Sequence, residues 1–281
     1  MHSKPRNLRD ALNDILTPAE KKKLITSFDI MGDIAVIDIP DELVGKEKEI
    51  GNALLQVHKS IKVVCKRSGI HEGDYRIRHV EVIAGEDRTE TVHRESGVSM
   101  KLDINNVYFT PRLSHERERV AEQVKPGETI GAFFAGVGPF PLVIAKKQPN
   151  VRIYAIELNP TAFEYMKYNI NVNGAGGCIH ALCGDVKEIA PPLLKGKCDR
   201  ILLTLPKGGE DFLDLALECA NNGCIIHFYQ FAPEEDHFSA AAKKVEEAAK
   251  RSKKKVEIVN RHIVRPYAPG INQIVLDIKV K

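Results

Sequence analysis

The 281-residue sequence has no long apolar run, no apolar signal region at its start and no Cys-x-x-Cys pair. A membrane-spanning helix needs about 20 mostly apolar residues, so the first absence predicts no transmembrane span. The polar start, MHSKPRNLRDALNDIL, argues against a secretory signal, and we expect a cytoplasmic protein. The six cysteines also have no histidine at zinc-like spacing beside them. We therefore expect no metal site, and small apolar roles for most of the thiols.

The composition is that of an ordinary globular protein, with 43% hydrophobic and 28% charged residues. A chain of this length forms one large domain or two modest ones. The net charge is only +3, but basic residues gather in four segments: 21–23, Arg76/Arg78, 112–119 and 250–255. Such segments are compatible with a polyanionic partner, although charge runs are usually solvated faces.

The first part of the chain carries short β-like runs, interrupted by one segment with helical spacing at 47–59. The runs are ITSFDIMG, IAVIDIP, KVVCKRSG, RIRHVEVIAG, TETVHRESG and MKLDINNVYF. This pattern predicts a small α+β domain at residues 25–110, preceded by an N-terminal segment at 1–24.

Strands and helices alternate in the second part, residues 111–281. Five apolar runs, TIGAFF, VRIYAIEL, CIHALCGD, CDRILLTLP and CIIHFYQF, have the pattern of strands buried on both faces. Helical segments at 139–147, 160–173, 186–194 and 209–220 separate them, which predicts a doubly wound parallel sheet. After a helix at 236–253, two strands split by PYAPG predict an antiparallel hairpin at one edge. The expected fold is α/β and Rossmann-like, with the layout of class I methyltransferases.

The stretch FAGVGPFP, between the first apolar run and its helix, is a glycine turn that dinucleotides, phosphates and S-adenosylmethionine all use. Gly136 and Gly138 fill the first two positions of a dinucleotide fingerprint, but Pro141 takes the third. No G-K-[ST] follows, which excludes a P-loop. A turn of this kind is also compatible with a simple tight bend.

Two acidic residues at the ends of later strands indicate which ligand the glycine turn holds. Glu157 ends the second run and can accept hydrogen bonds from both ribose hydroxyls of an adenosine. Asp185 ends the third run, where it is suitably placed to meet an adenine amino group. A ligand with adenosine but no phosphates fits this arrangement, and we expect S-adenosylmethionine.

Several ordered motifs together resemble the tRNA (guanine-N1)-methyltransferases that act on position 37, in their archaeal and eukaryotic branch. They are FAGVGPF, AIELNPTAFEYMKYNI, GDV, TLPKGGEDFL, RPYAPG, GDYRIRHVEVIAGE, HRESG and VYFTPRLSHERERV. The resemblance runs from about residue 25 to the end and lacks the extra N-terminal domain of some archaeal members. It implies methyl transfer to N1 of guanine 37 in the anticodon loop, by a monomer.

The resemblance also implies roles for individual residues. Glu116 matches the general base for N1–H, and Arg76 the cation for charge on O6, while Pro206 would line the guanine pocket. Four further residues match positions near the cofactor: Tyr108, Arg112, Phe134 and Asn159. From the residues alone other roles remain open. Glu116 could complement the charge at the start of a helix that Ser114 caps, and Arg117 and Arg119 could contact phosphates or form ion pairs. The four residues near the cofactor could serve in packing or, for Asn159, as a helix cap.

Two positions depart from the family pattern. Ala132 stands where an acid is usual, and Thr204 replaces the asparagine that opens the strand-four motif. Thr204 can still form a hydrogen bond through its hydroxyl, so we keep it among the catalytic residues. The alternatives are an aminocarboxypropyl transferase of wybutosine synthesis, a methyltransferase for a tricyclic wybutosine precursor, and a non-catalytic binding module.

Overall fold

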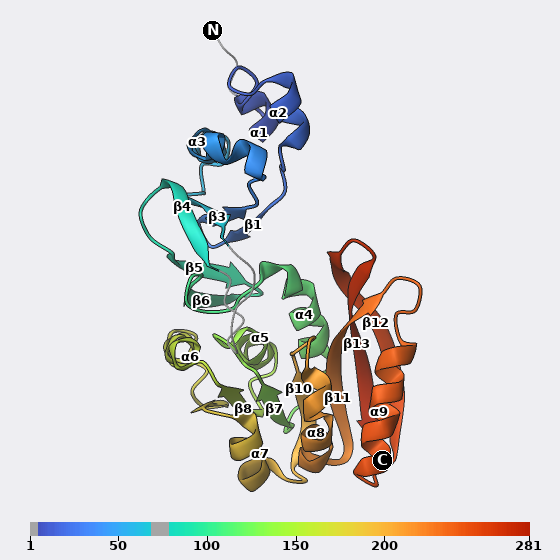
Figure 1. Ribbon diagram of the computed structural model, residues 1–281. Helices are drawn as coiled ribbons and strands as arrows, with labels where there is room; N and C mark the ends of the chain where they lie inside the picture. The colour runs from blue at the N-terminus through green and yellow to red at the C-terminus, as the bar shows by residue number, and fades with distance from the viewer. Residues whose placement is uncertain (1–4, 69–78) are drawn as a thin grey trace. The chain divides into compact units, whose positions relative to one another are not determined.

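The structure is a computed structural model that describes residues 5–68 and 79–281, and it divides into two compact units (Figure 1). The first unit comprises Met1–Arg94 and Ser99–Pro111, and the second comprises Glu95–Val98 and Arg112–Lys281. The short stretch Glu95–Val98 therefore belongs with the second unit, whereas the sequence predicts it within the small α+β domain at residues 25–110.

The first unit contains a four-stranded sheet in the order β1-β2-β3-β4. Its strands are β1 (Phe28–Met31), β2 (Ile34–Ile37), β3 (Val63–Arg67) and β4 (Val80–Gly85). The central pair β2–β3 is parallel, and the outer pairs are antiparallel. After the 3-10 helix η1 (Asp41–Lys46), α3 (Glu47–Val57) buries Ile50 and Leu54 in the apolar cluster of this unit. β5 (Glu90–Glu95) and β6 (Val98–Asp103) form a separate hairpin.

Two short helices near the start of the chain were not predicted. α1 (Leu8–Ala11) begins after Asn7, and α2 (Pro18–Lys23) begins with a capping box between Thr17 and Glu20. Helices of one turn to two turns are too short for a periodic pattern, so only their caps signal them. Four leucines of this region lie in the same apolar cluster as α3: Leu8, Leu12, Leu16 and Leu24. The sequence predicts a separate N-terminal segment at residues 1–24, whereas the structure packs these four leucines in the core of the first unit.

The second unit contains a seven-stranded sheet in the order β12-β13-β11-β10-β7-β8-β9 (Figure 1). Its strands are β7 (Thr129–Phe133), β8 (Arg152–Glu157), β9 (Ile179–Cys183), β10 (Cys198–Leu203), β11 (Ala220–Pro233), β12 (Val256–Ala268) and β13 (Ile271–Val280). β7 to β11 pair in parallel, and β13 pairs antiparallel with both β11 and β12. The predicted fold, five parallel strands with a closing hairpin, is confirmed.

Helices cover both faces of this sheet. They are α4 (Ser114–Gln123), α5 (Pro139–Lys147), α6 (Pro160–Val172), α7 (Val186–Leu194), α8 (Leu213–Cys219) and α9 (Ser239–Arg251). Phe228 of β11 packs in the apolar cluster that contains α7, α8 and α9, whereas its neighbour Tyr229 contacts Glu116 of α4 and Phe140 of α5. Adjacent strand residues point to opposite faces, so α4 and α5 cover the face opposite α8 and α9.

The predicted helix at 209–220 is in fact two elements, the 3-10 helix η3 (Gly209–Phe212) followed by α8. The predicted turn PYAPG is shorter than expected, because β12 continues to Ala268. No helix within residues 5–68 and 79–281 combines the length and the apolar character needed to cross a membrane.

Candidate active site

The carboxyl ends of three neighbouring strands lie level with one another in the second unit. Phe133 of β7 pairs with Ile156 of β8 and with Leu203 of β10. The residues that follow these three are all predicted site residues: Phe134, Glu157 and Thr204. In open α/β sheets, ligands bind outside the carboxyl ends of the strands. The register therefore brings three of the predicted residues to the edge where a ligand is expected.

The turn after β7 has left-handed backbone angles at three positions: Phe134 (φ 63°), Gly136 (φ 58°) and Gly138 (φ 90°). Glycine adopts such angles at little cost, whereas a phenylalanine there is strained, and strain of this kind clusters at functional sites. A β-carbon at Gly138 would also lie 3.2 Å from Cγ of Met166 in α6. Both the backbone and its neighbour thus require glycine at position 138.

Thr204, directly after β10, forms hydrogen bonds to this turn. Its hydroxyl lies 3.1 Å from the carbonyl oxygen of Phe133 and 3.3 Å from that of Phe134, and donates to them. The ring of Phe134 packs edge-on against Phe212, with the centroids 4.8 Å apart. The hydroxyl proton of Thr204 is therefore held by the backbone of the turn, and its lone pairs remain for a ligand.

Glu157 has the arrangement that a ribose requires. One carboxylate oxygen accepts the backbone N–H of Gly136 at 2.7 Å, and the other accepts that of Asn159 at 2.8 Å. The backbone N–H of Leu158 also acts on this carboxylate, which has about four acceptor positions, so acceptor capacity remains for a ribose hydroxyl. Burial raises the pKa of Glu157, and the backbone donors partly oppose that rise. The residues present therefore fit an adenosine.

Two predicted cofactor ligands are helix caps. Asn159 is the N-cap of α6, and its Oδ1 accepts the N–H groups of Thr161 at 2.9 Å and Ala162 at 3.4 Å. Of the alternatives left open by the sequence, the structure thus shows the cap. Asp185 is the N-cap of α7, and its Oδ1 accepts the N–H of Lys187 at 2.8 Å. A cofactor contact for either side chain stays a prediction.

A polar cluster holds the loop that contains Pro206. The side-chain amide of Gln230 donates to the carbonyl oxygen of Pro206 at 3.3 Å and to Glu210 at 3.0 Å. Lys244 of α9 donates to Gln230 at 2.8 Å and to Glu210 at 2.7 Å, which fixes the orientation of the amide. Burial alone would raise the pKa of Glu210, but Lys244 and its other donors lower it to about 2.

Glu116, the predicted base, lies in the first turn of α4 and is 4% exposed. Its Oε1 accepts from Arg119 Nη2 at 2.8 Å and from the Tyr229 hydroxyl at 2.6 Å, and its Oε2 accepts from Arg119 Nε at 2.7 Å. Tyr229 lies one residue beyond Phe228, which pairs with the last residue of β10. The carboxylate is therefore anchored at the ligand-binding edge of the sheet. The helix starts without a side-chain cap, so Ser114 does not act as one.

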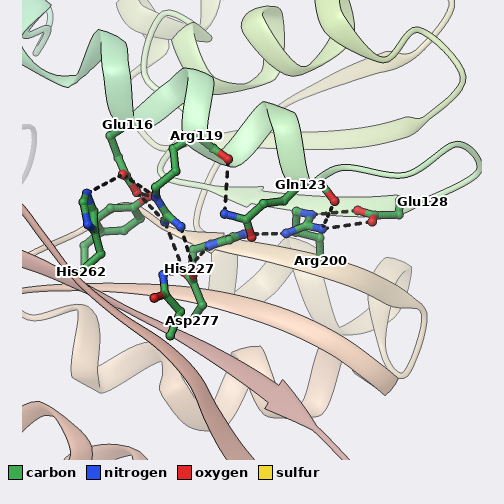
Figure 2. Close-up of polar contacts among 10 residues, drawn as sticks. Glu116, Arg119, Gln123, Glu128, Arg200, His227, His262 and Asp277 are labelled. Atoms are coloured by element: carbon green, nitrogen blue, oxygen red, sulfur yellow. Dashed lines mark hydrogen bonds and ion pairs between the residues drawn. The ribbon is translucent and has the colours of Figure 1, made fainter.

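A chain of buried charged groups continues from Glu116 beneath α4 (Figure 2). Arg119 also donates to Asp277 of β13 at 2.8 and 3.3 Å, and Asp277 Oδ1 lies 2.6 Å from Nδ1 of His227. Nε2 of His227 lies 2.7 Å from Nη1 of Arg200, which in turn forms a bidentate pair with Glu128 at 2.8 and 3.0 Å. Since arginine can only donate, His227 accepts at Nε2 and donates from Nδ1 to Asp277.

The pKa shifts in this chain agree with that proton arrangement. Burial lowers the pKa of His227, which keeps the imidazole neutral. Burial alone would raise the pKa of Asp277, but hydrogen bonds from His227, Arg119 and Asn260 hold it well below its usual range. Burial and the neighbouring Glu116 raise the pKa of Tyr229, which therefore stays protonated and donates.

Sequence reasoning missed this chain, although it left a signal. His227, Arg200 and Asp277 each stand among apolar residues of a strand, in CIIHFYQF, CDRILL and IVLDIKV. A titratable residue inside a strand buried on both faces must find a partner, because an unpaired buried charge is costly. The signal does not say which partner it finds.

Three predicted residues lie outside the described residues or outside the sheet of the second unit. Arg76, with its neighbour Arg78, lies outside the described residues. Tyr108 belongs to the first unit and is 46% exposed. Arg112 lies in the 3-10 turn η2 (Pro111–Leu113) and is exposed. The cofactor roles of Tyr108 and Arg112 and the O6-stabilising role of Arg76 stay predictions.

Arg117 is an ion-pair partner, not a surface arginine for phosphates. It is 1% exposed, and its guanidinium pairs with Glu95 at 2.5 and 2.7 Å. Arg119 is likewise paired, as described above. No group of three metal-ligating side chains occurs among the residues that the structure describes.

Two family models match the chain. Residues 91–259 match the TRM5/TYW2 methyltransferase domain, and residues 8–89 match the TYW2 N-terminal domain.

Individual relatives match over almost the whole chain. The tRNA (guanine(37)-N(1))-methyltransferase Trm5b of Pyrococcus abyssi is 42% identical over 99% of this chain and 81% of its own length. The tRNA(Phe) (4-demethylwyosine(37)-C(7)) aminocarboxypropyltransferase of Pyrococcus horikoshii is 31% identical over 99% of this chain and 97% of its own. The solved complex of aTrm5 with tRNALeu superimposes with a TM-score of 0.88 at 34% identity, covering 100% of this chain and 80% of that one.

Proposed function

The chain belongs to the TRM5/TYW2 methyltransferase family, and on that premise we propose that it transfers a methyl group from S-adenosylmethionine to N1 of guanine 37 in tRNA. The observation that carries the proposal is Glu116, a carboxylate fixed by Arg119 and Tyr229 at the ligand-binding edge of the sheet. N1 of neutral guanine holds a proton and becomes nucleophilic as that proton leaves, so the reaction needs a positioned base.

The residues of the chain divide the work as follows. Glu116 accepts the N1 proton, and Arg76 stabilises negative charge on O6. Pro206 lines the guanine pocket, with Thr204 supporting the turn beside it. The cofactor, when bound, supplies an electrophilic methyl carbon. The residues that hold it are Tyr108, Arg112, Phe134, Gly136, Gly138, Glu157, Asn159 and Asp185. The position of the Glu157 carboxylate at the strand end, with acceptor capacity left for a ribose hydroxyl, supports this assignment.

Transfer RNA is the partner that the proposal requires. Base modification in an anticodon loop requires the base to be splayed out of its stack and held in a pocket. The complex of the relative aTrm5 with tRNALeu supports a whole tRNA as the substrate. We place the reaction in the cytoplasm, where tRNA is used.

The test is incubation of an unmodified tRNA transcript with methyl-labelled S-adenosylmethionine, followed by nucleoside analysis. We expect label in 1-methylguanosine, and none in a transcript with adenosine at position 37. Glu116→Gln should slow single-turnover transfer about 100-fold or more, the usual contribution of a general base. Glu122→Gln, on the exposed side of the same helix, is the matched control and should leave the rate unchanged. Equal rates for the two variants would exclude Glu116 as the base.

Aminocarboxypropyl transfer is a second candidate, because residues 8–89 match the TYW2 N-terminal domain and one relative carries that activity in its name. The segment LLTLPKGGEDFL keeps the L-P-K and F-L of the methyltransferases, which favours methyl transfer. The two reactions transfer different parts of S-adenosylmethionine to the tRNA, so cofactor labelled in the methyl group or in the carboxyl group distinguishes them. Carboxyl label from the cofactor reaching a demethylwyosine-containing tRNA, with no methyl label in guanosine, would establish the alternative.

A further inference from the structure

The two oxygens of the Glu116 carboxylate are unequally occupied. Oε1 accepts two hydrogen bonds, from Arg119 and from Tyr229, which fills both of its lone pairs. Among the described residues, Oε2 accepts one hydrogen bond, from Arg119 Nε at 2.7 Å. Nε2 of His262 lies 4.0 Å from Oε2. Oε2 is therefore the oxygen with room for a proton.

While the methylated base occupies the site, a proton on Glu116 has no direct path to water, because the Glu116 side chain is otherwise 2% exposed. Arg119 cannot accept it, since the guanidinium remains protonated between two carboxylates. Tyr229 is buried and already donates its own hydrogen to Oε1. The base must nevertheless lose its proton before it can act again.

His262 lies beside this buried carboxylate (Figure 2). It lies on β12, the edge strand of the seven-stranded sheet, and its side chain is 46% exposed. Asn260, two residues earlier on the same strand, donates to Asp277 at 2.9 Å. Residues two apart on a strand share a face, so His262 points to the side of the sheet that holds Glu116. An imidazole can accept a proton at one nitrogen and release one from the other.

We propose that His262 carries the proton of the methylated base from Glu116 to solvent, an inference that rests on the proposed function. In the methyl-transfer step the N1–C bond forms, the C–S bond breaks and its electron pair stays on sulfur. The N1–H bond breaks and the proton goes to Glu116 Oε2. That proton then passes to Nε2 of His262, and the proton on Nδ1 leaves to water. Exchange of the ring protons with water returns the remaining proton from Nε2 to Nδ1 before the next turnover.

The separation of 4.0 Å between Oε2 and Nε2 is longer than the hydrogen-bond reach of about 3.2 Å for proton transfer. A rotation of the half-exposed His262 ring shortens the distance between the two atoms, and a bridging water is the other way to pass the proton. Each turnover thus releases one proton, and His262 sets how fast that release follows methylation.

The experiment follows the two products of the same reaction mixture. Rapid quench measures methyl transfer to tRNA, and stopped flow with a pH indicator in weak buffer measures the proton. In the wild-type enzyme the two traces should coincide. In His262→Ala the first methyl transfer should keep its rate, whereas proton release should lag by about 10-fold or more, as for loss of a general acid–base group. Steady-state turnover should fall to the same rate, and added imidazole should restore it.

Ile263→Ala is the matched control, because its exposed side chain is the next one along β12 and points to the other face. It should show no lag. Coincident traces in His262→Ala would overturn the proposal, since Glu116 would then return its proton without help. A slower first transfer that imidazole does not restore would also overturn it, by showing a structural or tRNA-binding role. Failure of the proposed function is separate: the wild-type enzyme would then form no 1-methylguanosine.

Discussion

We expect Arg119→Met to destabilise the second unit by about 3 kcal/mol at pH 7, because breaking a buried ion pair typically costs about 3–5 kcal/mol. Arg119 holds two buried carboxylates, Glu116 and Asp277, whose side chains are 2% and 4% exposed. Arg119 donates two hydrogen bonds to each carboxylate, and the variant loses all four while both acids remain buried. The lower end of the range applies, because the Arg119 side chain is 21% exposed and water can enter its place.

The cost should shrink as the pH falls below about 4. In the wild type the pKa of Asp277 is depressed, so its contribution is complete above the unfolded pKa of about 3.9 and is lost progressively below it. In the variant Asp277 stays buried but loses the two hydrogen bonds from Arg119, so its folded pKa rises toward the unfolded value. The variant therefore has less stability to lose on acidification than the wild type, and the difference between the two proteins decreases.

The assay is urea unfolding followed by circular dichroism at pH 7 and at about pH 3, below the unfolded pKa of Asp277. Hydrogen exchange of β13 peptides assigns the transition to the second unit. Arg251→Met is the matched control, because Arg251 pairs with Asp214 at 3.0 Å with both side chains at least half exposed. Such a surface pair contributes at most about 1 kcal/mol. An Arg119→Met cost no larger than that of the control, or one that does not change with pH, would refute the reasoning.

Two further substitutions test other parts of the site. Burial lowers the pKa of His227, so the unfolded chain takes up the proton first, and wild-type stability should fall below about pH 6.5 by up to about 1.4 kcal/mol per pH unit. Urea titrations at several pH values should show a smaller slope in His227→Asn and an unchanged slope in His180→Asn, an exposed position on β9; identical slopes in all three proteins would contradict this. Gly138→Ala places a side chain at φ 90° beside α6 and should weaken cofactor binding in calorimetry, at a strain of about 1–2 kcal/mol for the backbone alone. Gly127→Ala carries the same backbone strain (φ 86°) in open space and should leave binding intact; an equal loss in both variants would disconnect the turn from the cofactor site.

Much of the second unit could be predicted because its local signals agree with its fold. Apolar runs mark its five parallel strands, and α5 and α7 have the predicted bounds, Pro139–Lys147 and Val186–Leu194. The first unit was harder at its start, where α1 and α2 are too short for a periodic pattern. The strand ends placed Glu157 and Thr204 at one edge, since parallel strands end together.

The partners of Glu116 could not be predicted in the same way. Arg119 and Asp277 are 158 positions apart in the sequence, and no pattern along the chain says that they meet. His262 and Tyr229 reach the same carboxylate from two further strands, so the site depends on the order of strands in the sheet.

The sequence by itself determined which segments become strands and helices, because burial on one face or both imposes a period on the apolar residues. It also determined where the chain must turn tightly, because glycine at positions 136 and 138 permits left-handed backbone angles. Only the tertiary structure decided which buried charges neutralise one another, since that depends on distances across the sheet. Those distances fix Glu116 at the ligand-binding edge and leave His262 between it and water.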